Sequence, residues 1–74
     1  MRQITDSQFS ILELLREHGA LASGEISYAT GRPLASVEDD VQHLRNHAFV
    51  VLLSDDRLRL AMLGRRAVEG ARVG

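Results

Sequence analysis

Three side chains with the chemistry of metal ligands recur at helical spacing in the middle of the chain. Asp39, His43 and His47 follow one another every four residues, so a helix places them on one stripe, where histidines four apart can share a divalent metal ion. Two histidines and one carboxylate are also common as plain polar helix surface. We favour that second interpretation and predict no metal site and no cofactor.

No other grouping of reactive residues predicts catalysis. Serine, histidine and aspartate all occur, but no local motif sets a nucleophile beside a base, and no glycine-rich loop could cradle a phosphate. A chain of 74 residues without cysteine has no disulfide and little interior from which to exclude water. We therefore predict that the protein is not an enzyme.

The cationic residues are all arginine and are unevenly placed. Nine basic and ten acidic residues give a net charge of −1. The segment 1–44 carries a local charge of −4 and the segment 45–74 a local charge of +3, so the second segment is a candidate anion-facing surface. Arginine suits bidentate contacts with phosphates and bases, but a GC-rich genome produces the same bias, and we favour that origin.

The first elements that must position these residues are two helices. Thr5 and Gln8 have capping-box spacing at the start of an amphipathic helix over about 6–18, and Gly19 ends it. The next three residues form an extended link or a short strand. Ser23 then caps a short helix over about 24–30, which ends at Gly31.

A third helix is expected over about 34–47. Pro33 suits its first turn, although the spacing of Ser36 and Asp39 offers a capping box slightly later. Its buried stripe follows the helical period and comprises Val37, Val41, Leu44 and Ala48.

The period then changes to that of a strand, and a β-hairpin is expected over about 49–61. Arg57 and Arg59 share one face of its second strand, and Leu58 and Leu60 share the other. A short helix over about 63–70 follows. The fold class is mainly α with a small β-hairpin, in one domain over residues 1–74. The chain has no apolar stretch long enough for a membrane span and no signal segment, so we expect a cytoplasmic protein without membrane contact.

This order of elements resembles the winged helix-turn-helix domain of bacterial and phage transcription regulators. The resemblance rests on the segment 26–31, on Val37 and Leu44, on the segment 48–51, on the hairpin strand 57–60 and on Leu63-Gly64-Arg65-Arg66. It implies a three-helix core with a hairpin wing, double-stranded DNA as the partner, and either a homodimer or a tandem partner. In that family the third helix enters the major groove and the wing contacts the backbone or the minor groove.

Carried onto this sequence, the resemblance implies base contacts from the third helix and phosphate contacts from arginines around it. The candidates for base contacts are Ser36, Gln42 and His43. The candidates for phosphate contacts are Tyr28, Arg32, Arg45, Arg57 and Arg59. Tyr28 is equally consistent with a packed aromatic side chain, and the two strand arginines with a solvated strand face.

Acidic residues at the same places suggest an alternative. Glu38, Asp39 and Asp40 lie in the third helix, and Asp55 and Asp56 lie at the tip of the hairpin. The first three either complement the helix dipole from its first turn or form an acidic patch that docks a basic protein partner. The hairpin pair suits a turn, where aspartate is favoured. The alternative function is a winged-helix protein-interaction module that does not bind DNA.

Overall fold

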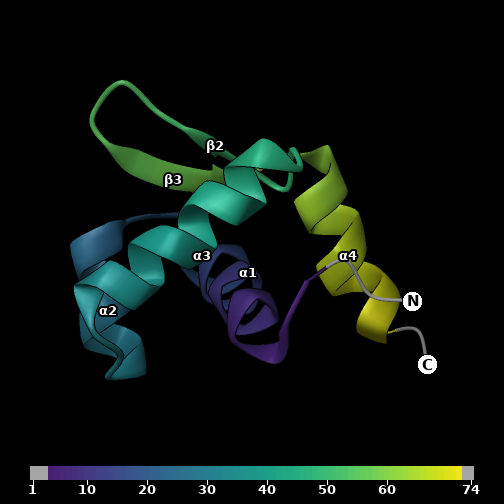
Figure 1. Cartoon of the computed structure of the whole chain (residues 1–74). Helices are drawn as coiled ribbons and strands as arrows, with labels where there is room; N and C mark the ends of the chain where they lie inside the picture. The colour runs from purple at the N-terminus through teal and green to yellow at the C-terminus, as the bar shows by residue number, and fades with distance from the viewer. Residues whose placement is uncertain (1–3, 73–74) are drawn as a thin grey trace.

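The computed structural model describes residues 4–72, which form four helices and a three-stranded sheet (Figure 1). In chain order these are α1 (Asp6–His18), β1 (Ala20–Ala22), α2 (Ser23–Thr30), α3 (Leu34–Asn46), β2 (Val50–Leu52), β3 (Arg57–Leu60) and α4 (Met62–Arg72). The predicted fold class, a helical core with a hairpin wing and a C-terminal helix, is confirmed. No helix within the described range is both long and apolar enough to span a membrane.

Helix α1 begins with the predicted capping box. The Thr5 hydroxyl accepts a hydrogen bond from the Gln8 backbone N–H at 3.1 Å, and Gln8 Oε1 accepts one from the Thr5 N–H at 3.0 Å. These two bonds satisfy N–H groups that have no partner inside the helix. The helix ends where Gly19 takes a positive φ of 86°, which a residue with a side chain rarely adopts.

The capping residues of α2 and α3 differ from the predictions, although α3 begins at the expected residue 34. Ser23 is the first residue of α2 rather than its cap, and the Glu25 carboxylate instead accepts from the Ala22 N–H at 2.8 Å. Pro33 stands just before α3, which begins at Leu34. The serine of the expected later capping box therefore lies inside the helix. Proline without an N–H fits this boundary, because the first N–H groups of a helix have no intrahelical acceptor.

The sheet is antiparallel with the order β1-β3-β2. Strands β2 and β3 form the predicted hairpin, which we call the wing (residues 50–60), and β1 adds a third strand by pairing Leu21 with Leu58. The turn is closed by the Asp56 N–H donating to the Leu53 carbonyl at 3.1 Å. Asp56 has φ 65°, so this loop resembles a turn followed by a bulge residue in the left-handed region.

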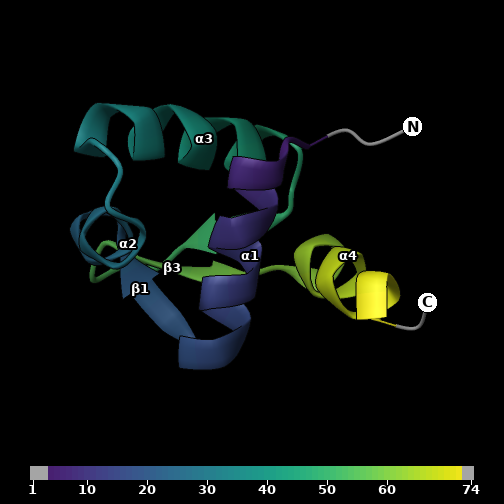
Figure 2. The same cartoon turned by 90° about the horizontal axis from the view of Figure 1, so that it is seen from below.

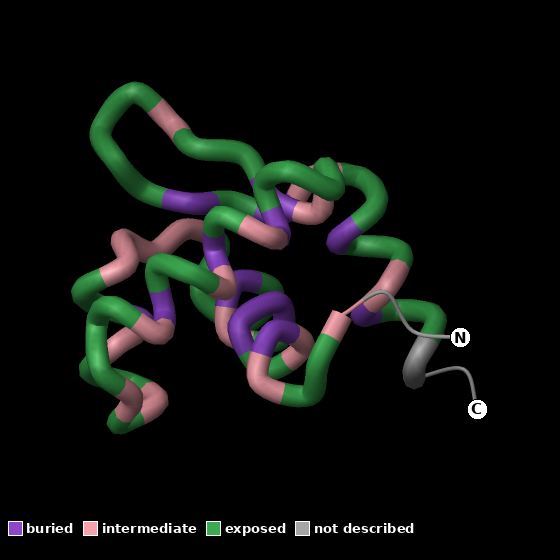
Figure 3. The backbone as a smooth tube through the Cα atoms, viewed as in Figure 1, coloured by how far each residue is buried: buried purple, intermediate pink, exposed green. Residues whose placement is uncertain are grey.

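One core joins the helices to the inner face of the sheet (Figures 2 and 3). Leu58 and Leu60 face inward and are buried, whereas Arg57 and Arg59 alternate with them and are exposed. The fully buried side chains also include Ile11, Leu12, Leu15, Ile26, Val37, Leu44 and Val68. The predicted stripe of α3 is confirmed for Val37, Val41 and Leu44.

The fourth residue predicted for that stripe, Ala48, is exposed, because the helix has already ended. The Phe49 N–H donates to the Leu44 carbonyl at 2.8 Å, and the Ala48 N–H donates to the Arg45 carbonyl at 3.1 Å. This is the hydrogen-bond pattern of a Schellman motif. Ala48 occupies its left-handed position with φ 62°, where glycine is the usual residue.

Helix α4 approaches the rest of the domain at a glycine. A Cβ atom built on Gly64 would lie 2.0 Å from the Phe49 carbonyl oxygen, far inside van der Waals contact. The same carbonyl accepts from the Ala61 N–H at 3.0 Å. The absence of a side chain at Gly64 therefore lets α4 pack against the chain that leads into β2.

Candidate nucleic-acid interface

Helix α3 lies on the front of the molecule in Figure 1, with the wing above it. Because its valines and Leu44 face the core, the other side of the helix is presented to solvent. Gln42 is exposed on that side and donates from Nε2 to Asn46 Oδ1 at 3.1 Å, while Ser36 and His43 are half-buried. A helix that shows a polar face beside a hairpin has the shape needed to enter a groove of duplex DNA.

A groove of about 410 Å³ separates α3 from the wing. Its apolar floor is made by Val41, Leu52 and Leu58. The polar side chains at its edges are Ser23, Glu38, Gln42, Arg45 and Asp56. Two predicted contact residues of α3, Gln42 and Arg45, thus lie at the same groove as the carboxylates of Glu38 and Asp56.

Tyr28 is the most exposed large hydrophobic residue in the described range, at 92% of its full accessible area. The alternative prediction that it packs as a core aromatic is therefore wrong. It stands on α2, the helix that precedes α3, so its ring and hydroxyl are open to a partner. This position is compatible with the phosphate contact that the sequence predicted.

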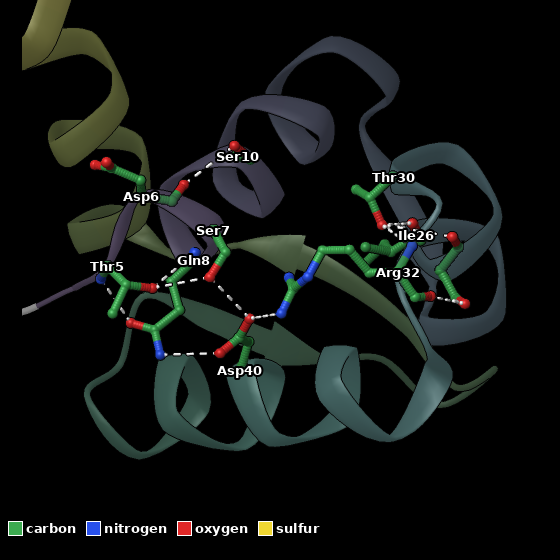
Figure 4. A network of polar contacts seen from close by, with 10 residues as sticks. Thr5, Asp6, Ser7, Gln8, Ser10, Ile26, Thr30, Arg32 and Asp40 are labelled. Atoms are coloured by element: carbon green, nitrogen blue, oxygen red, sulfur yellow. Dashed lines mark hydrogen bonds and ion pairs between the residues drawn. The ribbon is translucent and has the colours of Figure 1, made fainter.

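Arg32 is placed differently from the other candidate arginines. Its Nη2 atom lies 2.6 Å from Asp40 Oδ2, in a pair whose side chains are 28% and 14% exposed. The guanidinium is thus engaged within the protein (Figure 4). Arg32 does not present a free charge in this structure, in contrast to what its position in the predicted phosphate set required.

The two strand arginines lie beside different parts of the molecule. Arg57 is near the tip of the wing, with Nη2 3.9 Å from Glu25 Oε1. Arg59 instead lines a second groove of about 500 Å³ with Arg16 and Arg65. The last turn of α1, which borders that groove, lies on the side opposite α3 in Figure 2. Arg57 is therefore placed beside α2 near the wing tip, and Arg59 beside the last turn of α1.

The acidic residues of α3 are not in its first turn, which contains no acid. The interpretation of Glu38, Asp39 and Asp40 as partners of the helix dipole is therefore wrong, because α3 begins earlier than that interpretation requires. Glu38 and Asp39 are exposed, and Asp40 is turned inward against α1. The acidic surface is smaller by one residue than the sequence suggested.

At the wing tip, turn chemistry accounts for the aspartates. Asp55 Oδ1 accepts from the Arg57 N–H at 3.2 Å. Asp56 occupies the left-handed position of the loop, a conformation that aspartate tolerates better than most residues. These observations agree with the predicted turn role of the pair.

The histidine stripe is arranged as helix surface. The rings of His43 and His47 lie 4.2 Å apart, and His47 Nδ1 is 3.0 Å from the His43 carbonyl oxygen. Within residues 4–72 no three histidine, cysteine, aspartate or glutamate side chains come together as a metal site. The alternative of a metal held by Asp39, His43 and His47 has no geometric support there.

Sequence reasoning missed the inward role of Asp40 and the pairing of Arg57 with Glu25. The one signal in the sequence for a partner of Asp40 was glutamine at position 8. A capping box accepts glutamate at this position as well. Only the amide carries a donor as well as an acceptor. That donor is used here, as Gln8 Nε2 lies 3.2 Å from Asp40 Oδ1.

Comparison with known proteins supports the fold. No protein-family model and no curated protein matches the sequence. Among solved structures, a MarR family protein from Bacillus stearothermophilus is similar at TM-score 0.91 and 29% identity, over 97% of this chain and 54% of that one. The reduced form of MarR from E. coli is similar at TM-score 0.90 and 20% identity, over 96% and 53%.

Ligand-free NadR is similar at TM-score 0.83 and 29% identity, over 95% of this chain and 55% of that chain. The chain thus spans about half the length of the solved structures that it matches. The similarity extends over nearly all of α1 to α4, including the wing. The chain is therefore a winged helix-turn-helix domain of the kind that MarR-family proteins contain.

Proposed function

We propose that this domain binds double-stranded DNA as part of a transcription regulator, with α3 in the major groove and the wing against the adjacent backbone. The observation that carries the proposal is the exposed polar face of α3 beside the wing, in a fold shared with MarR-family proteins. Fold alone does not assign function, so the proposal depends on the side chains of this face.

Different residues have different roles in the proposal. Ser36 and Gln42 reach base edges, since glutamine can pair with adenine and serine tolerates several bases. Arg45 is exposed at the groove between α3 and the wing, Arg57 is exposed near the wing tip, and both neutralise phosphates. Tyr28 donates its hydroxyl to a phosphate from α2. A single module of this size offers limited contact area, so we propose that a homodimer or a tandem partner supplies useful specificity.

The test is fluorescence anisotropy with a labelled random-sequence duplex over a salt series. Non-specific binding by the wild-type domain is expected with Kd of about 10⁻⁴ to 10⁻⁶ M at physiological salt, tightening as salt falls. Arg45→Ala and Arg57→Ala should each weaken binding and reduce the slope of log K against log salt by about 1. Absence of any wild-type binding at the lowest salt would overturn the proposal.

Arg59→Ala is the matched control for Arg57→Ala. Both variants remove one positive charge from the same strand, but Arg59 lies farther from the wing tip and lines a groove with Arg16 and Arg65. We expect Arg59→Ala to leave the salt slope unchanged. An equal loss of slope in the two variants would mean that bulk charge, and not the position of Arg57 near the wing tip, governs the interaction.

A second candidate is docking of a basic protein segment on the acidic part of the same face. Glu38, Asp39 and Asp56 are exposed, and their carboxylates have no hydrogen-bond or ion-pair partner among residues 4–72. Unpaired carboxylates repel phosphates and attract lysine or arginine. If this candidate holds, a synthetic lysine-rich peptide binds the wild type, and the double variant Glu38→Arg/Asp39→Arg loses the peptide. Duplex binding without peptide binding by the wild type would exclude it.

A further inference from the structure

Asp40 is the meeting point of three side chains from two distant parts of the chain (Figure 4). Its Oδ2 atom is 2.6 Å from Arg32 Nη2 and accepts from Ser7 Oγ at 3.3 Å, while its Oδ1 atom accepts from Gln8 Nε2 at 3.2 Å. Both carboxylate oxygens are therefore occupied, and the side chain is only 14% exposed. These contacts join the second turn of α3 to the first turn of α1.

Gln8 uses both ends of its amide. The carbonyl oxygen accepts from the Thr5 N–H at 3.0 Å as part of the capping box, and the amino group donates to Asp40. Gln8 is 7% exposed and belongs to the buried residues of the domain. The cap that starts α1 is thus connected directly to α3, and a carboxylate at position 8 would face the Asp40 carboxylate.

Arg32 is held from both its backbone and its side chain. Its carbonyl oxygen accepts from Ser27 Oγ at 2.6 Å, and its N–H donates to Thr30 Oγ1 at 3.4 Å. Its Nη1 atom is buried and has no hydrogen-bond partner among the described residues. The guanidinium therefore points into the molecule, toward Asp40, and connects the turn after α2 with α3.

We propose that Ser7, Gln8, Arg32 and Asp40 form a polar clamp that fixes α3 against α1 and α2, and that Arg32 and Asp40 are positioning residues for the DNA-reading helix. Neither residue contacts DNA in this proposal. Its consequence for DNA binding rests on the proposed function, whereas its consequence for the order of α3 holds in the free domain. A partly buried charge pair is costly to break by removing one partner, which suits it to hold a helix in a single position.

Two variants with opposite changes in charge distinguish the clamp from a direct phosphate contact by Arg32. Arg32→Gln removes a positive charge and Asp40→Asn removes a negative one, so direct electrostatics predicts weaker DNA binding for the first and tighter binding for the second. The clamp predicts that both weaken binding, by about tenfold, with an unchanged salt slope. The double variant should lose no more affinity than either single variant, since one contact is removed in all three cases.

Asp39→Asn is the matched control. Asp39 precedes Asp40 on the same helix, is exposed and has no partner among residues 4–72. Its substitution removes the same charge as Asp40→Asn without affecting the clamp. We expect unchanged or tighter DNA binding for Asp39→Asn. If Asp40→Asn behaves in the same way and Arg32→Gln lowers the salt slope by about 1, Arg32 is a phosphate contact and the clamp is overturned.

Amide hydrogen exchange on the free domain provides a readout that needs no DNA. We expect the amide protons of α3 from Val37 onward to exchange about tenfold faster in Arg32→Gln and Asp40→Asn than in the wild type. The increase in exchange rate should be smaller in the core of α1. Gln8→Glu should have the same effect, because it keeps the acceptor for the Thr5 N–H but sets two carboxylates against each other. Wild-type exchange rates in α3 of these variants would overturn the clamp.

The two proposals fail in different ways. A wild-type domain that binds no duplex at low salt removes the proposed function, and the exchange rates of α3 alone then decide whether the clamp exists. If the wild-type domain binds DNA, and Arg32→Gln weakens binding while Asp40→Asn tightens it, the clamp is excluded and the proposed function stands. If a single variant unfolds, the milder Ser7→Ala, which removes only the 3.3 Å bond to Asp40, is measured in its place.

Discussion

The helix-turn-helix part of the molecule, residues 4–46, and the wing part, residues 47–72, are positioned by different kinds of contact. In the first part, polar side chains join one helix to the next, as Asp40 does with Arg32 and Gln8. In the second part, the decisive features are backbone conformations, namely the positive φ angles of Ala48 and Asp56 and the close approach at Gly64.

This difference suggests how substitutions will act in each part. Where side chains position a helix, removal of a polar group should change the placement of α3 and spare the rest of the domain. Where the backbone makes the contact, polar substitutions should have little effect, and changes to or from glycine should have large ones. The largest effect is therefore expected in the wing part, at the residue that allows α4 to pack.

Gly64→Ala should destabilise the domain by about 3 kcal/mol. The added Cβ would lie 2.0 Å from the Phe49 carbonyl oxygen and 3.1 Å from Leu60 Cδ2. The first of these atoms belongs to the backbone and cannot rotate away, so α4 must move. Urea denaturation of the purified variant measures the loss.

Gly70→Ala in the same helix is the control for this variant, because a Cβ built on Gly70 meets no atom within 4 Å. It should be neutral or stabilising by up to about 1 kcal/mol, as alanine favours a helix over glycine. Similar losses for the two variants would show that helix propensity, and not the contact with Phe49, controls the stability of α4.

Much of this fold follows from local sequence patterns. The capping box of Thr5 and Gln8, the helical spacing of Val37, Val41 and Leu44, and the alternation of arginine and leucine in β3 are each legible within a few residues. Burial then follows directly, because one stripe of a helix or one face of a strand is apolar. These are the features that the structure confirms.

The candidate site was less predictable, because its decisive contacts join residues far apart in the chain. Nothing in the local pattern around Asp40 distinguishes it from Glu38 or Asp39, yet only Asp40 is turned inward. Arg32 and Arg59 were likewise grouped with the other arginines as phosphate contacts, although Arg32 is paired with Asp40 and Arg59 lines the second groove. Their separation depends on how α1 and α4 lie against the sheet and the turn, which is a property of the assembled fold.

A stabilising change of intermediate size is expected at the end of α3. The left-handed conformation of Ala48 is unfavourable by roughly 1–2 kcal/mol for a residue with a Cβ. Glycine avoids most of this strain but loses more backbone entropy on folding. Ala48→Gly should therefore stabilise the domain by about 1 kcal/mol. Thermal and urea denaturation measure it, and a loss of stability would mean that the Schellman motif is not formed in solution.

The smallest effect is expected at the wing tip, where Asp56 has φ 65°. Aspartate tolerates this conformation better than alanine does, so Asp56→Gly should stabilise the domain by only about 0.5 kcal/mol.

Asp56→Asn removes the same charge as Asp56→Gly while keeping a residue suited to the left-handed region. If DNA binding tightens equally in both variants, the charge of Asp56 opposes the phosphates. If it tightens only in the glycine variant, the conformation of the wing tip controls the contact with the backbone.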